Sequence, residues 1–253
     1  MIFALFGALA IGLSLGLLGS GGSILTVPVL IYLVGQDEKV AIAGSLFIVG
    51  LIALVGAIRP ALKKQVSWNT VLWFGLPGMA GTWIGAYLSG FMSGLIQLLL
   101  FACIMLLAAW NMLKGNKNAD EPSGPRQPHK IILDGLIVGT VTGLVGVGGG
   151  FLIVPALVIL GGLTMHTAVA TSLVIIALKS FSGFVKYLDV LAQANLSLDW
   201  QILWIIAGIG IIGSLIGNQL SDKLPQQMLK KVFGIFLIIM GLFILIKTAP
   251  GLM

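Results

Sequence analysis

The sequence predicts an all-α, polytopic membrane protein that consists of two inverted repeats, and three observations lead to this prediction. Hydrophobic residues make up 58% of the 253 residues and charged residues only 9%, whereas soluble domains carry about 25% charged residues. A glycine-rich motif occurs twice at a constant offset, and most positive charges gather in a few of the loops. Each repeat is expected to hold a glycine-tipped hairpin of short helices followed by three spanning helices.

The duplicated motif reads LLGSGGSILTVP over residues 17–28 and LVGVGGGFLIVP over residues 144–155. The offset of 127 residues also relates Ser45 to Ser172, and it becomes 132 after an insertion of five residues. Such a constant offset indicates two copies of one unit. The predicted division of the chain is a first transmembrane repeat (1–115), a cytoplasmic linker (116–130) and a second transmembrane repeat (131–253).

Each copy contains five apolar segments. In the first copy they cover residues 2–18, 23–34, 40–58, 70–88 and 94–113, and in the second 131–145, 150–160, 165–185, 200–220 and 228–246. A straight helix needs about 20 residues to span a bilayer, so the second segment of each copy is too short. The first two segments are therefore interpreted as a hairpin whose glycine tip lies inside the membrane. We expect Pro28 and Pro155 to kink the short helices.

The loop charges predict how the two copies are oriented. Ten of the 14 basic residues lie after the third segment of copy one, in the linker, or around the last loop, whereas the loop from Lys186 to Asp199 carries two aspartates. The positive-inside rule places the basic loops in the cytoplasm. Counting crossings then puts both termini outside and inverts the second copy, whether the hairpins are re-entrant or fully spanning. Inverted repeats around broken helices are typical of secondary transporters.

The two glycine clusters form the first candidate site. The hairpin tips are expected to meet near the membrane midplane, where the starts of the short helices present free N–H groups and partial positive charge. Two such helix ends favour a small anion, and the alternative is that the glycines only permit close packing. The candidate substrate-binding residues here are Gly19, Ser20, Gly21, Gly22, Ser23, Gly146, Gly148, Gly149 and Gly150.

The third segment of each copy supplies the remaining candidates. Ser45, Thr171 and Ser172 carry hydroxyls that either bind the substrate or hydrogen-bond to the preceding helical turn. Lys179 lies seven residues after Ser172, and its counterpart in the first copy is Ile52. An intramembrane lysine indicates a functional site with an anionic partner, and the alternative is that its side chain reaches the outer interface.

Enzymatic signatures are absent from the sequence. The glycine clusters lack the βαβ context of a dinucleotide site, and neither His129 nor His166 belongs to a cluster of metal ligands. An intramembrane serine hydrolase is disfavoured because Val147 replaces Ser20 in the second copy. We therefore expect no catalytic residue, cofactor or metal. The net charge of +6 resides in short loops, so it reports orientation rather than nucleic-acid binding.

The paired motifs resemble those of the sulfite exporter TauE/SafE family. The resemblance rests on the Gly-x-Gly-Gly-Gly/Ser…Pro patterns of residues 19–28 and 146–155 and on the Gly/Thr-Ser-Leu triplets of residues 44–46 and 171–173, and it covers essentially the whole chain. It implies a prokaryotic plasma-membrane transporter for sulfur-containing anions such as sulfite, thiosulfate or organosulfonates. Ser23 and Gly44 depart from the second copy's pattern, which leaves the substrate open.

The expected mechanism is alternating access at a site between the repeats, with a small anion as substrate and a proton or Na⁺ as coupling ion. A passive anion channel is the alternative that the same residues allow. Membrane lipid is the other expected partner, and the oligomeric state stays open.

Overall fold

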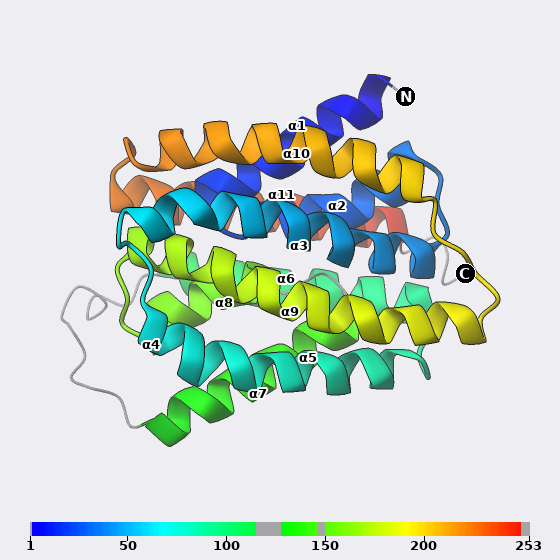
Figure 1. The fold of residues 1–253 in the computed structure, drawn as a ribbon, viewed down its shortest axis with the longest axis horizontal. Helices are drawn as coiled ribbons and strands as arrows, with labels where there is room; N and C mark the ends of the chain where they lie inside the picture. Colours follow the sequence, from blue (N-terminus) through cyan, green and yellow to red (C-terminus); the bar gives the residue numbers. More distant parts are fainter. Residues whose placement is uncertain (1, 115–127, 146–149, 249–253) are drawn as a thin grey trace.

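The computed structural model of the protein describes residues 2–114, 128–145 and 150–248, and the described chain is helical with no strand (Figure 1). In chain order the elements are α1 (Ile2–Leu18), α2 (Gly21–Pro28), η1 (Val29–Leu33), α3 (Glu38–Leu62), α4 (Trp68–Thr70), η2 (Val71–Gly75), α5 (Leu76–Ser89), α6 (Gly94–Lys114), α7 (Pro128–Val145), α8 (Gly150–Pro155), η3 (Ala156–Leu160), α9 (Met165–Gln193), α10 (Trp200–Ser221) and α11 (Gln226–Thr248). The three η elements have π-helical geometry.

The predicted segments agree with the observed helices to within a few residues, with one exception. The third segment of the second copy was expected to end at residue 185, but α9 continues to Gln193. Lys186 therefore lies in a helix and not in the expected loop. Its Nζ donates to Asp189 at 2.8 Å and lies over the ring of Trp83, and these contacts stabilise the additional turns.

Both short hairpin helices change from α to π geometry directly after their proline. α2 ends at Pro28 and continues as η1, and α8 ends at Pro155 and continues as η3. Proline lacks a backbone N–H and crowds the carbonyl of the preceding turn, so it interrupts the regular hydrogen-bond ladder. The disturbance that the prolines predict thus takes the form of a π turn at equivalent places in the two copies.

Helix length and burial separate central from peripheral helices. Among the described residues, α3, α9, α10 and most of α11 are long and apolar enough to span a membrane. The most apolar windows of α3 and α9 are 78% and 72% buried, against 33% for α11. Large apolar side chains such as Phe3, Leu62 and Phe91 are more than three-quarters exposed. A surface of this kind suits contact with lipid.

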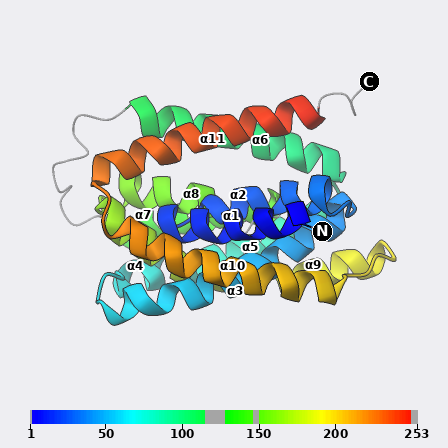
Figure 2. The ribbon, with the colours of Figure 1, turned by 90° about the horizontal axis from the view of Figure 1, so that it is seen from above.

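The equivalent helices α3 and α9 lie side by side and run in opposite directions (Figure 1). The hairpins are exchanged between the copies, since α1 packs against α10 and α7 packs against α5. Helices α6 and α11 cross at one face of the molecule (Figure 2). The short helices lie inside, with α2 against α3 and α11, and α8 against α9 and α6.

Close glycine contacts repeat at equivalent positions. A Cβ atom at Gly12 would overlap the carbonyl oxygen of Gly210, and one at Gly139 would overlap that of Gly78. Gly12 corresponds to Gly139, and Gly78 to Gly210, so one contact occurs twice with the copies interchanged. Small residues allow helix backbones to approach in this way. The contacts agree with the internal duplication, and the inverted membrane orientation of the copies stays a prediction.

Candidate functional site

The first glycine tip is docked on α9. Gly19 has a φ of +72°, and a Cβ atom there would lie 2.6 Å from Ser172 Oγ and 2.8 Å from Val169 Cα. The Ser172 hydroxyl lies 2.8 Å from the carbonyl oxygen of Gly19, to which it donates. Glycine is thus needed for both backbone conformation and space. Gly22 serves packing, because a Cβ atom there would lie 2.7 Å from Leu15 Cβ in α1.

The second tip is described only at its flanks. Gly146, Gly148 and Gly149 lie outside the described residues, and Gly150 begins α8. Before the tip, Leu144 accepts a hydrogen bond from Gln97 Nε2 at 2.6 Å.

The described residues do not test whether the two hairpin tips meet, because the second tip lies outside them, but the short helices α2 and α8 that follow the tips contact each other. The first tip contacts Ser172, whereas Gly143, close before the second tip, accepts a hydrogen bond from the Tyr187 hydroxyl at 3.3 Å. Ser172 and Tyr187 are separated by about 22 Å along α9. α1 and α7 have 17 and 18 residues, so each helix is about 25 Å long.

Most of the candidate hydroxyls are already hydrogen-bonded. Ser23 and Ser45 donate to carbonyl oxygens of the preceding turn at 2.7 Å each, as the back-bonding alternative describes. Thr171 Oγ1 accepts from the backbone N–H of Ser67 at 3.0 Å and so ties α9 to the loop before α4. Ser20 is different, because its hydroxyl is fully buried and has no partner in the described part of the chain.

Lys179 is the most unusual side chain of the set. It is 0% exposed, and its Nζ has no hydrogen-bond partner among the described residues. The ammonium lies 4.9 Å from the centre of the Phe74 ring. The side chain therefore does not reach the outer interface, and that alternative is wrong. The neighbouring Ser180 hydroxyl is also buried without a described partner.

The surroundings of Lys179 match those of its apolar counterpart. Lys179 packs on Gly78 of α5, where a Cβ atom would overlap its Cε, and Ile52 packs in the same way on Gly210 of α10. The chain thus places an ammonium in a position that the other copy fills with a hydrocarbon side chain. An unpaired buried charge costs several kcal/mol, and the contact with Phe74 recovers only about 0.5–2 kcal/mol.

The candidate residues are only partly brought together. Gly19 and Ser172 touch, and Thr171 lies beside Ser172 in the same turn. Lys179 lies about 10 Å further along α9, and Ser45 belongs to α3. The site is therefore distributed along the central helix pair.

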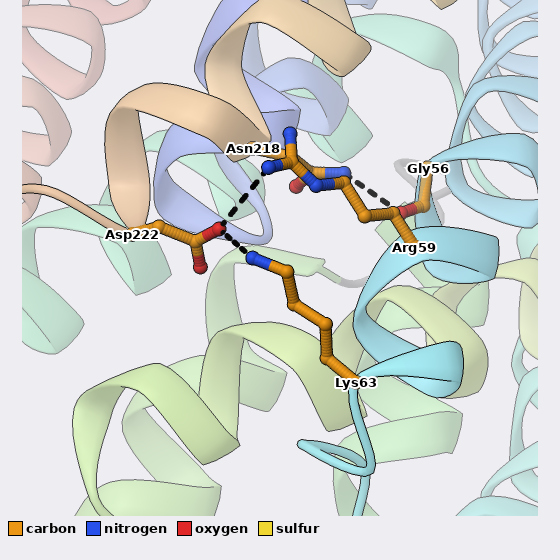
Figure 3. A network of polar contacts seen from close by, with 5 residues as sticks. All are labelled: Gly56, Arg59, Lys63, Asn218 and Asp222. Atoms are coloured by element: carbon orange, nitrogen blue, oxygen red, sulfur yellow. Dashed lines mark hydrogen bonds and ion pairs between the residues drawn. The ribbon is translucent and has the colours of Figure 1, made fainter.

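A polar network that the sequence analysis missed joins the ends of α3 and α10 (Figure 3). Arg59 Nη2 lies 3.7 Å from Asp222 Oδ2, and Lys63 Nζ contacts the same oxygen. One turn inward, Asn218 Nδ2 donates to the Gly56 carbonyl at 2.7 Å. Burial acts to raise the pKa of Asp222, but the hydrogen bond from Lys63 and the nearby positive charges hold it below its ordinary value of 3.8. Asp222 is therefore ionised at neutral pH.

The signal for this network was present but incomplete. Arg59 and Lys63 at the end of α3, and Asn218 and Asp222 at the end of α10, each have the i, i+4 spacing that places two side chains on one helix face. Nothing in the sequence says that the two helix ends meet.

The opposite end of the molecule is closed by a different network. Lys39 Nζ donates to the Ser89 carbonyl and to Gln97 Oε1, each at 2.7 Å. Gln97 Nε2 in turn lies 3.0 Å from the Tyr187 hydroxyl. Gln97 and Tyr187 are fully buried, so these bonds seal this end.

Comparisons with known proteins support one family. The family model described as sulfite exporter TauE/SafE matches residues 4–244. A probable membrane transporter protein of Xylella fastidiosa is 33% identical over 96% of this chain and 94% of its own length. Probable membrane transporter proteins of Bacillus subtilis (30%; 89% of this chain, 90% of the relative) and Methanocaldococcus jannaschii (27%; 93% of each) are also similar. No solved structure matches the chain significantly.

Proposed function

Because the chain belongs to the sulfite exporter TauE/SafE family of membrane transporters, we propose that it is a secondary transporter of small sulfur-containing anions. Sulfite, thiosulfate and organosulfonates are the proposed substrates. Transport proceeds across the prokaryotic plasma membrane by alternating access, coupled to a proton or Na⁺ gradient. Both termini lie outside.

Lys179 is the observation that supports an anionic substrate. Its ammonium is buried between α9 and α5 and has no described hydrogen-bond partner. Polar and ionisable groups are costly inside a membrane and are retained where they act on a solute. A small anion supplies the missing partner. The buried hydroxyl of Ser180, next to Lys179 in α9, and that of Ser20, at the first hairpin tip, have no described partner and supply neutral donors.

The helix arrangement supports alternating access. The α3–α9 pair forms the centre, and each hairpin packs on a helix of the other copy. When one copy shifts against the other, its spanning helix therefore carries along the hairpin of the other copy that packs on it. The two ends of the molecule are held by different networks, so that one end can open while the other stays closed.

The first experiment measures binding by thermal shift on detergent-purified protein. Sulfite, thiosulfate and sulfoacetate are compared with chloride for the wild type, for Lys179→Met and for Lys186→Met. Lys186 lies on the same helix but at its outer end, paired with Asp189. We expect a sulfur oxyanion to stabilise the wild type and Lys186→Met at concentrations at least tenfold lower than those that Lys179→Met requires. The anion proposal fails if no anion stabilises the folded wild type, or if chloride acts equally.

A second measurement separates a carrier from a channel. Proteoliposomes are loaded with unlabelled sulfoacetate and diluted into a trace of labelled sulfoacetate. A carrier exchanges the two and accumulates label transiently above equilibrium, because its binding site faces one side at a time. Simple equilibration without this overshoot would identify a passive channel.

A further inference from the structure

A pocket lies beside the network that joins α3 to α10. Its wall is formed by residues that include Arg59, Lys63, His166, Asn218, Ser221 and Asp222. The free space between them is about 20 Å³, which is room for about one water molecule, so a larger solute enters only by displacing a lining side chain. Val169, on which the Gly19 tip rests, also lines it. The pocket and the first glycine tip therefore share Val169 as a neighbour.

The internal duplication relates the two ends of the molecule, where equivalent residues have different surroundings. Residues 39 and 89 of the first copy correspond to residues 166 and 221 of the second. At the first end, the long side chain of Lys39 reaches the Ser89 carbonyl. At the second end, the corresponding His166 and Ser221 both line the open pocket.

The charges around the pocket are unequal. Arg59 and Lys63 both contact one oxygen of the Asp222 carboxylate, so two positive charges share one negative charge. The arginine contact is 3.7 Å long, well beyond the usual length of a charge-assisted hydrogen bond. The guanidinium therefore keeps donor capacity for a second oxyanion.

The contact with Asp222 is also weak enough to exchange. The side chains of Arg59, Lys63 and Asp222 are 39%, 40% and 28% exposed, and ion pairs of this exposure contribute about 0–1 kcal/mol. A sulfonate or sulfite group offers several oxygens to the guanidinium fork, which binds planar pairs of oxygens well. Replacing the carboxylate by such a group costs little.

We propose that this pocket is an access site for small oxyanions, in which Asp222 acts as a built-in competitor. An arriving oxyanion displaces the Asp222 carboxylate from Arg59, and this displacement loosens the tie between the ends of α3 and α10. The proposal rests on the anion transport proposed above. It adds a second, shallower binding site and a means by which the substrate opens its own way inward.

The test titrates sulfoacetate into the detergent-purified full chain in the Lys179→Met background, where the central lysine is absent, and follows the thermal shift. We expect weak binding to remain in Lys179→Met. Adding Asp222→Asn should lower the half-saturating sulfoacetate concentration at least threefold, and adding Arg59→Gln together with Lys63→Gln should raise it at least tenfold. Lys223→Gln is the control, because it removes one positive charge next to Asp222 but outside the pocket wall. Adding it should change the half-saturating concentration less than twofold.

Each outcome decides the proposal. It is overturned if wild type binds sulfoacetate but Lys179→Met binds none, or if Asp222→Asn leaves the titration unchanged. The proposed function itself fails only if the wild type binds no sulfur oxyanion, so the two failures are distinct. If the variant that combines Arg59→Gln and Lys63→Gln with Lys179→Met does not fold, as judged by its melting curve without ligand, the result for Asp222→Asn decides alone.

Discussion

At the residue scale, Lys179 and Ile52 place an amine and a hydrocarbon side chain at equivalent positions of a duplicated framework. Both side chains pack on a glycine of the facing helix at equivalent positions. Ile52 is apolar, so packing alone stabilises it. Lys179 also buries an amine that has no described hydrogen-bond partner. This difference supports the proposal that Lys179 serves anion binding, because its burial does not favour stability.

This interpretation predicts that Lys179→Met stabilises the protein when no anion is present. Methionine retains most of the side-chain volume and removes the burial cost of the charge, so we expect a gain of about 1–3 kcal/mol, or a rise in Tm of several degrees. Thermal unfolding in detergent measures it. Lys186→Met is the control and should not gain, because it loses the contacts with Asp189 and Trp83. A lower Tm for Lys179→Met would assign the lysine a structural role.

Sequence reasoning finds some site residues more readily than others for a physical reason. A lysine within an apolar run is conspicuous because its transfer into a membrane is costly, so Lys179 is a candidate from the sequence alone. The partner of Thr171 is the backbone N–H of Ser67, and the partner of Asp222 is Lys63. Both contacts join positions more than 100 residues apart, and no local pattern encodes them.

At the element scale, the short helices of the hairpins were predictable from the sequence, whereas the extension of α9 to Gln193 and the contact partners of the first tip were not. Apolar run length and proline positions correctly give the short helices α2 and α8 with their interruptions at Pro28 and Pro155. Where a tip stops depends on which side chains of a neighbouring helix receive it. For the first tip these are Val169 and Ser172, which the sequence places on another segment of the other copy.

The docking of the first tip predicts a difference between two glycine substitutions. Gly19 and Gly35 both have positive φ, +72° and +79°, but a Cβ atom at Gly35 meets nothing within 4 Å. Alanine at either position adds backbone strain of about 1–2 kcal/mol. Gly19→Ala must also displace Val169 and Ser172, for about 1–3 kcal/mol more. In thermal unfolding, the melting temperature of Gly19→Ala should therefore lie well below that of Gly35→Ala. Equal melting temperatures would show that the tip is not tightly seated.

At the scale of the whole molecule, two similar halves produce two different ends. Glycine contacts repeat between the copies, as at Gly12 and Gly139, so the helix framework is nearly symmetric. The ends are not symmetric, because Lys39 seals one of them while His166 lines a pocket at the other. The alternating access proposed above needs two related conformations of unequal stability, and a nearly symmetric framework with different end networks is suited to both requirements.

The same framework predicts on which side of the membrane each end lies. The α3–α4 and α9–α10 loops are equivalent in the two copies, and they lie at opposite ends of the molecule (Figure 1). Lys64 and Asn195, one in each loop, are both exposed. In a Cys103→Ala background expressed in a bacterial host, a membrane-impermeant maleimide added to intact spheroplasts should label Asn195→Cys. It should label Lys64→Cys only after the membrane is opened, because the basic loops stay in the cytoplasm. The parent protein without cysteine controls for background. Labelling of both positions from the same side would contradict the inverted arrangement, and labelling of Lys64→Cys alone would reverse the orientation of the whole molecule.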